Sequence, residues 1–328
     1  MSDLLSVNNV VKKYASHLAL NKVSIDVPRQ SIYGLLGPNG AGKTSLIRII
    51  NQITAPDSGE IFLNGEKLRP GHISVIGYLP EERGLYKKMK VGEQALYFAM
   101  LKGLTRKDAL TKLKIWFEKF EIQGWWNKKV EELSKGMQQK IQFIITVLHQ
   151  PELLILDEPF SGFDPINTNI IKDEILRMRK EGATVIFSTH NMASVEEICD
   201  SIALLNKAEK ILEGRVNEIR SAHKTNIYEI EFRGNMIGFA NALWSNFELL
   251  EKTEEGNIQK AKIKLLKGST SNKLLENLLP VADIVSFREI IPGMNDIFIE
   301  HVSEPPGIKN REILFFNSKE LKKGGAGE

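Results

Sequence analysis

Short, unbroken apolar runs recur along the first two-thirds of the chain, and stretches with helical spacing lie between them. Apolar runs rich in β-branched residues are typical of strands that are covered on both faces of a sheet. In residues 105–120 the apolar positions repeat at helical spacing, and a second helix is predicted from Pro165 to Gly182. Strands that alternate with helices indicate a parallel sheet in an α/β fold. The predicted strands are 31–37, 73–79, 153–158, 184–189 and 201–206.

The pattern changes after about Arg215, where strands and helices of a different order follow. Residues 226–234, 259–268 and 282–290 are predicted strands, and 238–251 and 269–280 are predicted helices. This order indicates a small α+β domain. We therefore expect an α/β domain over 1–221, an α+β accessory domain over 222–302, and a tail over 303–328 that ends in disorder.

Composition excludes several classes of protein. The 328 residues are 42% hydrophobic and 26% charged, an ordinary globular balance. The net charge of +3 comes without clustered Lys and Arg, so no nucleic acid is expected as a partner. No run of about 18 apolar residues is present that could span a membrane, and the first residues lack a secretory pattern. A single cysteine, Cys199, rules out an internal disulfide and fits a reducing compartment, so we expect a cytoplasmic protein.

Residues Gly37–Thr44 match G-x-x-x-x-G-K-[ST], a phosphate-binding loop. The match follows a predicted strand and opens a predicted helix, which is the context that the motif requires. Glycines let the backbone fold closely around a phosphate, and the helix N-terminus presents free amides to the anion. Lys43 would reach the terminal phosphates and Thr44 would bind Mg²⁺. The alternative is a glycine turn formed by chance.

A buried strand that ends in two acids, Asp157 and Glu158, is the second chemical signal. Buried carboxylates are costly unless they meet a cation or take part in chemistry. Asp157 is therefore a candidate Mg²⁺ ligand and Glu158 a candidate general base for a water molecule. The alternative is a pair of solvated acids at a strand end.

Two further segments allow more than one interpretation. His190 follows a predicted strand at the carboxyl edge of the sheet, where ligands bind in α/β folds, although it could be an ordinary loop residue. Residues 133–142, LSKGMQQKIQ, form a glycine turn that opens an amphipathic helix. Ser134 could cap that helix, or it could bind a phosphate through the same free end of the helix.

These segments stand in an order that resembles the ATP-binding subunit of an ABC transporter, over about residues 3–220. By this resemblance, GPNGAGKT is the Walker A loop, LLILDE is Walker B with Glu158 as the catalytic base, LSKGMQQK is the signature motif, and SGFD is the D-loop. His190 matches the switch histidine, and Tyr14 matches the aromatic residue that stacks on adenine, although a strand-edge aromatic would look the same. The resemblance implies that ATP contacts Tyr14, Gly37, Pro38, Asn39, Gly40, Ala41, Gly42, Lys43, Thr44 and Ser45.

The resemblance also gives a reason why the chain would need a second phosphate-binding segment. In that family two subunits pack head to tail, and each ATP lies between one chain's Walker A loop and the other's signature helix. Ser134 and Gly136 would then bind the γ-phosphate held by a second copy or a homologous subunit, and Asp164 would help to connect the two sites. A helical subdomain over about 88–150 would carry the signature motif.

The sequence departs from the family pattern at three sites. The usual LSGGQ is LSKGM here, with Lys135 and Met137 in place of Gly and Gln, and Phe163 replaces a leucine in the D-loop. Glu81 stands where the family usually has a glutamine that contacts Mg²⁺ and the membrane partner. A carboxylate can bind the ion as well, so the expected Mg²⁺ ligands are Thr44, Asp157 and Glu81.

The resemblance also implies partners and a location. The chain would hydrolyse ATP on the inner face of the cell membrane for a separate polytopic permease, and residues 78–86 and 133–140 look most like export-type subunits. The accessory domain is similar to one often appended to such subunits, as a regulatory module or a passive appendage. The alternative is a regulatory or translation-associated ATPase of the same fold that has no membrane partner.

Overall fold

The computed structural model describes residues 3–82, 84–160, 165–266 and 268–303. The described chain forms two compact units, of which the first runs to Val216 and the second begins at Asn217. Residues 301–303 group with the first unit. Residues 304–328, in the predicted tail, and the D-loop residues 161–164, which include Phe163 and Asp164, lie outside the described residues.

The first unit contains a six-stranded sheet in which all five strands predicted for this part of the chain are present. Its order is β10-β9-β3-β8-β7-β6; β10 runs antiparallel to β9, and the other neighbours are parallel. Every residue of β3, β7 and β8 is buried, which explains their unbroken apolar runs. The strands are β3 (Ile32–Leu36), β6 (Ile76–Leu79), β7 (Leu153–Asp157), β8 (Thr184–Thr189), β9 (Ser201–Asn206) and β10 (Glu209–Arg215).

A second, antiparallel sheet in the same unit was missed by the sequence pattern. Its order is β2-β1-β4-β5, and its strands are β1 (Asp3–Tyr14), β2 (His17–Pro28), β4 (Ser58–Leu63) and β5 (Glu66–Lys67). Register shifts interrupt the pairing of β1 with β2 at several points, one of them between Val7 and Val10. Such irregularities break the strict alternation by which a half-buried strand is recognised in a sequence.

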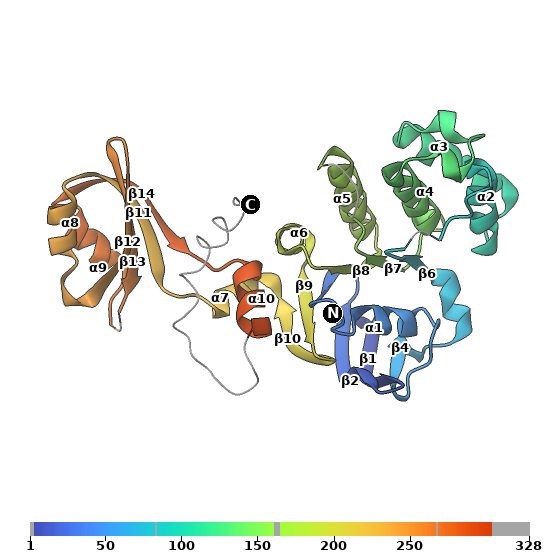
Figure 1. The fold of residues 1–328 in the computed structure, drawn as a ribbon, viewed down its shortest axis with the longest axis horizontal. Helices are drawn as coiled ribbons and strands as arrows, with labels where there is room; N and C mark the ends of the chain where they lie inside the picture. The colour runs from blue at the N-terminus through green and yellow to red at the C-terminus, as the bar shows by residue number, and fades with distance from the viewer. Residues whose placement is uncertain (1–2, 83, 161–164, 267, 304–328) are drawn as a thin grey trace, which may run out of the picture. The chain divides into compact units, whose positions relative to one another are not determined.

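Helices cover both faces of the six-stranded sheet (Figure 1). Helix α1 (Lys43–Ile50) packs in one core between the two sheets. The other face packs against α4 (Lys135–Val147) and α5 (Pro165–Lys180), with α6 (Met192–Ile198) beside them. Helices α2 (Val91–Leu101) and α3 (Arg106–Lys119) join α4 in a helical subdomain. Thr105 caps α3, since its Oγ1 accepts a hydrogen bond from Asp108 N at 3.2 Å.

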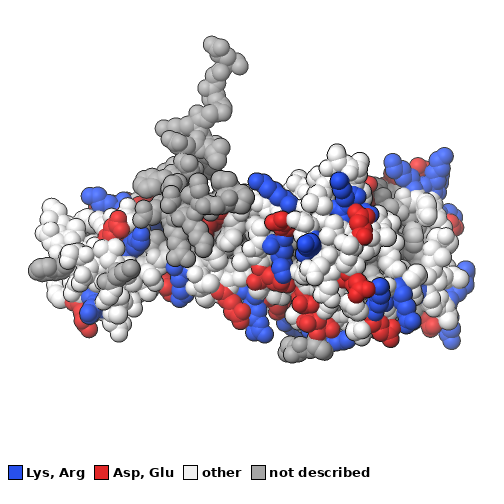
Figure 2. Space-filling view, turned by 90° about the horizontal axis from the view of Figure 1, so that it is seen from below, with Lys and Arg blue, Asp and Glu red and all other residues white. Residues whose placement is uncertain are grey.

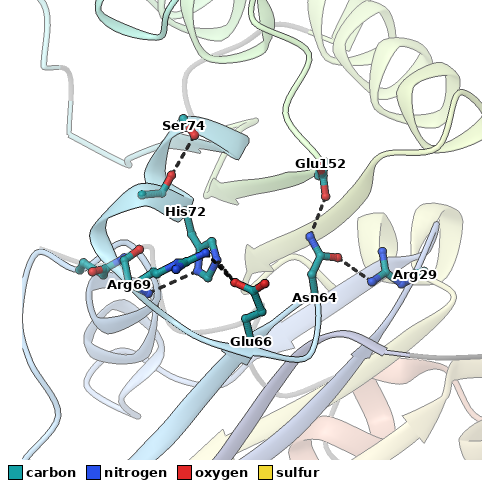
Figure 3. A network of polar contacts seen from close by, with 9 residues as sticks. Arg29, Asn64, Glu66, Arg69, His72, Ser74 and Glu152 are labelled. Atoms are coloured by element: carbon teal, nitrogen blue, oxygen red, sulfur yellow. Dashed lines mark hydrogen bonds and ion pairs between the residues drawn. The ribbon is translucent and has the colours of Figure 1, made fainter.

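A polar network ties the two sheets together at the start of β6 and β7 (Figure 3). The Asn64 side chain accepts a hydrogen bond from the Arg29 guanidinium at 2.6 Å and donates one to Glu152, the residue that precedes β7, at 2.9 Å. Nearby, Arg69 N donates to His72 Nδ1 at 3.3 Å, at the first turn of the 3₁₀ helix η1 (Pro70–Val75), which runs into β6. These contacts lie near the start of β6, the strand that precedes Glu81.

The second unit is an α+β domain with an antiparallel sheet of order β12-β13-β11-β14. Its core lies between that sheet and two helices. On the other face, charges alternate across strands: Lys262 is paired with Glu251, and Glu229 with Arg288. The elements are α7 (Val216–Ala222), β11 (Ile227–Gly234), α8 (Met236–Ala242), β12 (Phe247–Glu255), β13 (Ile258–Leu265), α9 (Ser271–Leu278), β14 (Ala282–Ile290) and α10 (Met294–Ser303).

The prediction of one helix over 238–251 was wrong. Helix α8 ends at Ala242, and β12 begins at Phe247, which is buried and pairs with Leu265. Glu248 lies opposite Lys264, so the strand also gains a favourable charge pair. Tertiary pairing therefore overrides the helical spacing of the leucines in this segment.

On the face in Figure 2, the described residues carry interspersed charges of both signs, without a broad patch of one sign. None of the helices in the described part is both long and apolar enough to cross a bilayer.

Candidate nucleotide-binding site

One cavity of about 220 Å³ gathers most of the predicted site residues. The phosphate loop forms its floor, between the end of β3 and the start of α1. The residues around it come from β1, β2, the segment after β6, the end of β7 and the end of β8. They are Tyr14, His17, Ala19, Asn39, Gly40, Ala41, Gly42, Lys43, Thr44, Ser45, Glu81, Asp157, Glu158 and His190.

The loop glycines have conformations and surroundings that other residues do not tolerate. Gly42, the N-cap of α1, has φ 111°, and a Cβ built there would lie 2.3 Å from the Ala19 carbonyl oxygen. Gly37 has φ 147°, and its Cβ would lie 2.3 Å from the Leu205 carbonyl oxygen. The loop is therefore packed against β2 and β9. The first turn of α1 lines the cavity, and the amides of a helix's first turn have no partner within the helix.

Lys43 bends back over the loop that carries it. Its Nζ donates hydrogen bonds to the carbonyl oxygens of Gly37 at 2.6 Å and Pro38 at 3.1 Å. Burial lowers the pKa of Lys43, and the nearby carboxylates act in the opposite direction. A buried cation whose hydrogen bonds go to neutral carbonyl groups is well placed to turn to a phosphate, because charge-assisted hydrogen bonds are stronger.

Asp157 and Glu81 line the cavity together with Thr44. Asp157 is only 3% exposed, and burial is the main cause that raises its pKa, with the carboxylates of Glu81 and Glu158 adding to it. A bound cation would relieve this cost. The hydroxyl and carboxylate oxygens present are the hard donors that Mg²⁺ prefers, so these residues fit that ion.

Glu158 is held in a strained position at the cavity edge. Its φ of 49° lies in the left-handed region, which is rare for residues with a Cβ. Its amide donates to the Ser188 carbonyl oxygen at 2.9 Å. Its carboxylate accepts hydrogen bonds from Thr189 Oγ1 at 3.1 Å and from His190 N at 3.0 Å, and His190 Nδ1 lies 2.7 Å from it.

Tyr14 lies at the end of β1, on the rim of the cavity. Its side chain is 37% exposed, and Lys12 Nζ lies 5.4 Å from the centre of the ring. An aromatic ring at the mouth of a phosphate site can stack on a base.

The signature segment lies apart from this cavity. Ser134 caps α4, since its Oγ accepts a hydrogen bond from Met137 N at 3.3 Å, so the capping interpretation is correct as far as it goes. Neither Ser134 nor Gly136 is among the residues that line the cavity, and both are exposed or half-buried at the helix N-terminus. The predicted D-loop residue Asp164 lies outside the described residues.

Sequence reasoning missed three neighbours of the site. His17 and Ala19 line the cavity from β2, a strand that the pattern did not reveal. Thr189 holds Glu158 in place, and its position directly before His190 at a strand end was an available signal.

The chain is similar in sequence and in fold to known proteins. Residues 20–161 match the family model described as ABC transporter, and residues 214–302 match that of the ATP-binding protein DrrA1-3-like, C-terminal domain. The uncharacterized ABC transporter ATP-binding protein YhaQ of Bacillus subtilis is 39% identical over 305 residues, 91% of this chain and 98% of its own. The linearmycin resistance ATP-binding protein LnrL of the same organism is 31% identical over 66% of this chain and 71% of its own.

A solved structure of an ATP-binding subunit of an ABC transporter is also similar. It is 30% identical, with a TM-score of 0.63 over 67% of this chain and 92% of its own. The mixed sheet with its helical subdomain is therefore the fold of this family, and the predicted α/β architecture is confirmed. With YhaQ similar over nearly the whole of both chains, the protein belongs to the family of ABC transporter ATP-binding proteins.

Proposed function

We propose that this chain hydrolyses ATP and that the energy drives export through a separate membrane permease. The observation that carries the proposal is the single cavity in which the phosphate loop, Asp157, Glu81 and Glu158 meet. A site built to bind ATP without hydrolysing it would not need an acid at the edge of the phosphate cavity. The cytoplasmic face of the membrane is the location that this function requires.

Charge neutralisation and positioning account for most of the catalysis of phosphoryl transfer. Lys43 would leave the Gly37 and Pro38 carbonyl groups and bind the terminal phosphates, together with the amides at the start of α1. Thr44, Asp157 and Glu81 would hold Mg²⁺, which supplies further charge neutralisation at the phosphate oxygens. Tyr14 would stack on the adenine.

Glu158 would orient and deprotonate the attacking water. A general base contributes roughly 10²–10⁴ in rate, which is about 3–5 kcal/mol of barrier. His190 would contact the γ-phosphate, since it already lies 2.7 Å from the Glu158 carboxylate and its side chain is 72% exposed. A phosphate bound at the γ position would therefore interact with both Glu158 and His190.

A second subunit would complete the site. Ser134 and Gly136 lie at the N-terminus of α4 and not in their own chain's cavity, so their free helix end is available to another chain's γ-phosphate. We propose that a second copy of this chain, or a homologous subunit, binds ATP between its Walker A loop and this helix. Asp164 would connect the two sites.

An exposed apolar surface beside the Glu81 segment is the proposed contact with the permease. Tyr86, Tyr97, Met100 and Leu101 are 45–63% exposed, and the Tyr86 ring stacks on Phe98 with centroids 5.9 Å apart. Exposed apolar groups of this size commonly mark protein interfaces. The name of LnrL, a linearmycin resistance protein, supports export as the direction.

The test of hydrolysis is Glu158→Gln, in which the amide keeps the shape of the side chain. Its Oε1 can still accept from His190 N, so the cavity should stay intact and ATP should bind as before. We expect the ATPase rate to fall by about 10²–10⁴-fold and gel filtration with ATP and Mg²⁺ to show a stable dimer. Glu118→Gln, an exposed residue of α3, is the matched control and should behave as the wild type. A Glu158→Gln protein that turns over ATP normally, or that stays monomeric at high concentration, would contradict the proposal.

The test of the transport partner is purification from detergent-solubilised membranes. We expect a polytopic membrane protein to co-purify with the chain. Recovery with ribosomes, and with no membrane protein, would favour a regulatory or translation-associated ATPase instead.

A further inference from the structure

A buried glutamine links the signature helix to the catalytic segment of its own chain. Gln139 lies on α4, two turns or less from Ser134, and is only 8% exposed. Its Nε2 donates a hydrogen bond to the Pro159 carbonyl oxygen at 3.0 Å. Pro159 is itself buried and directly follows Glu158 in the chain.

Stability alone does not explain this side chain. The Oε1 atom of Gln139 is buried and has no hydrogen-bond partner within the part of the chain that the structure describes. A buried polar atom without a partner destabilises a fold, and an apolar residue of the same size would avoid that cost. Of the other buried positions on α4, Ile141, Phe143 and Ile144 are apolar, whereas Gln142 and Thr146 are polar and donate hydrogen bonds to backbone carbonyl groups. The amide at position 139 therefore calls for a reason other than packing.

The turn that Gln139 contacts is the strained one. Glu158 has left-handed backbone, and such strain persists at active sites only where the surroundings hold it. On one side the Glu158 amide is bonded to the Ser188 carbonyl group, and its carboxylate is held by Thr189 and His190. On the other side Gln139 holds the carbonyl group of the next residue.

We propose that Gln139 is a positioning residue for hydrolysis, which ties the helix that carries the signature segment to the strained turn that aims Glu158. The inference rests on the proposed function. One turn further along α4, Gln142 Nε2 donates to the Glu82 carbonyl oxygen at 3.4 Å, next to Glu81. Helix α4 thus contacts both the segment that contains Glu81 and the turn that contains Glu158. When its N-terminus engages the partner's nucleotide, a shift of α4 reaches Glu158 directly through Gln139.

The test is Gln139→Met, which keeps the length and removes the donor. The nucleotide cavity does not include Gln139, so ATP affinity, KM and ATP-driven dimerisation in the Glu158→Gln background should match those without the Gln139 change. We expect kcat to fall by about 10–100-fold, the range for a misplaced catalytic group. The melting temperature should change little, because the loss of the bond to Pro159 is offset by removal of the unpartnered Oε1.

Gln150→Met is the control, at an exposed glutamine just beyond the C-terminal end of α4. Gln150 Oε1 accepts a hydrogen bond from Lys112 Nζ at 2.9 Å, and neither residue lies in the signature motif or beside Glu81 or Glu158. Its kcat should stay within about twofold of the wild type. If Gln139→Met does not fold, Gln139→Asn, whose shorter amide cannot reach Pro159, should show the same loss of kcat.

The outcomes separate the two proposals. Wild-type protein that does not hydrolyse ATP would overturn the proposed function itself. Wild-type protein that is active, together with a Gln139→Met protein of unchanged kcat, would overturn only the role of Gln139. A parallel loss of kcat and of melting temperature in both Gln139 variants would show a purely structural residue and would also overturn it.

Discussion

Replacement of Gly42 by alanine should damage the phosphate loop in two ways whose sizes follow from its geometry. The backbone at φ 111° disfavours any residue with a Cβ, at a cost of about 1–2 kcal/mol. The new methyl group would lie 2.3 Å from the Ala19 carbonyl oxygen and 2.9 Å from Leu20 Cδ2, and overpacking of this kind costs about 1–3 kcal/mol. The sum is a loss of about 2–5 kcal/mol in the free energy of unfolding. Since Ala19 also lines the cavity, ATP binding should weaken as well.

Gly40 offers a control that separates the two costs. It has φ 80°, but a Cβ built there meets nothing within 4 Å in the described structure, so Gly40→Ala should lose only the backbone cost of about 1–2 kcal/mol. Urea unfolding without nucleotide gives the stability of each variant, and calorimetry gives its ATP affinity. A Gly42→Ala protein that is at least as stable as Gly40→Ala would show that the loop does not pack closely against β2 at this position.

Two further predictions concern α4. Ser134→Arg should keep ATP binding, because Ser134 is outside its own chain's cavity, but it should abolish ATP turnover. Calorimetry measures the binding and a phosphate-release assay measures the turnover. Turnover at the wild-type rate would show that Ser134 serves only to cap the helix. His149 follows α4, its Nε2 lies 3.3 Å from the Ile76 carbonyl oxygen, and burial, with the Lys102 charge, lowers its pKa to about 4. Because the folded protein then binds the proton less well than the unfolded chain, the stability from this group is complete above about pH 6.5 and is lost as pH falls towards 4. When the pH falls from 7.5 to 5.5, the free energy of unfolding of the wild type should decrease by about 1 kcal/mol more than that of His149→Gln, after allowance for partial exposure. Urea unfolding at both pH values measures the two decreases, and equal decreases would contradict this prediction.

The parts of the fold that the sequence predicted are those in which burial is uniform. Strands β3, β7 and β8 are buried at every position, so apolar runs identify them without any knowledge of their neighbours. Strands β1 and β2 have one buried face and register shifts, and their pattern becomes clear only from the pairing. Strand β12 is stabilised by β13 opposite it, through contacts such as that between Phe247 and Leu265. No local signal in residues 247–255 contains that information.

The residues of the candidate site also differ in whether a local sequence signal or only a tertiary contact identifies them. The phosphate loop is one continuous stretch of sequence, and Asp157 and Glu158 are adjacent at the end of β7, so the chemistry of each segment follows from residue type and spacing. Thr189 and Gln139 matter because of what they contact across the fold, at 3.1 Å to Glu158 and 3.0 Å to Pro159. A threonine at a strand end and a glutamine on an amphipathic helix are common residues, so their type alone could not single them out.

Glu158 is the position at which local backbone preference and tertiary structure oppose each other most directly. A residue with a Cβ loses about 1–2 kcal/mol in left-handed backbone, and glycine would relieve that strain but would remove the carboxylate. The hydrogen bonds from Thr189 and His190 to the carboxylate are charge-assisted, and each contributes about 1.5–3 kcal/mol, enough to hold the strained turn. Helix α4 holds the same turn from the other side through Gln139. The orientation of the Glu158 carboxylate therefore depends on the relative positions of α4 and the end of β8. In the proposed dimer, a nucleotide bound at the N-terminus of α4 would change those relative positions, and this would give the partner's ATP a physical route to Glu158.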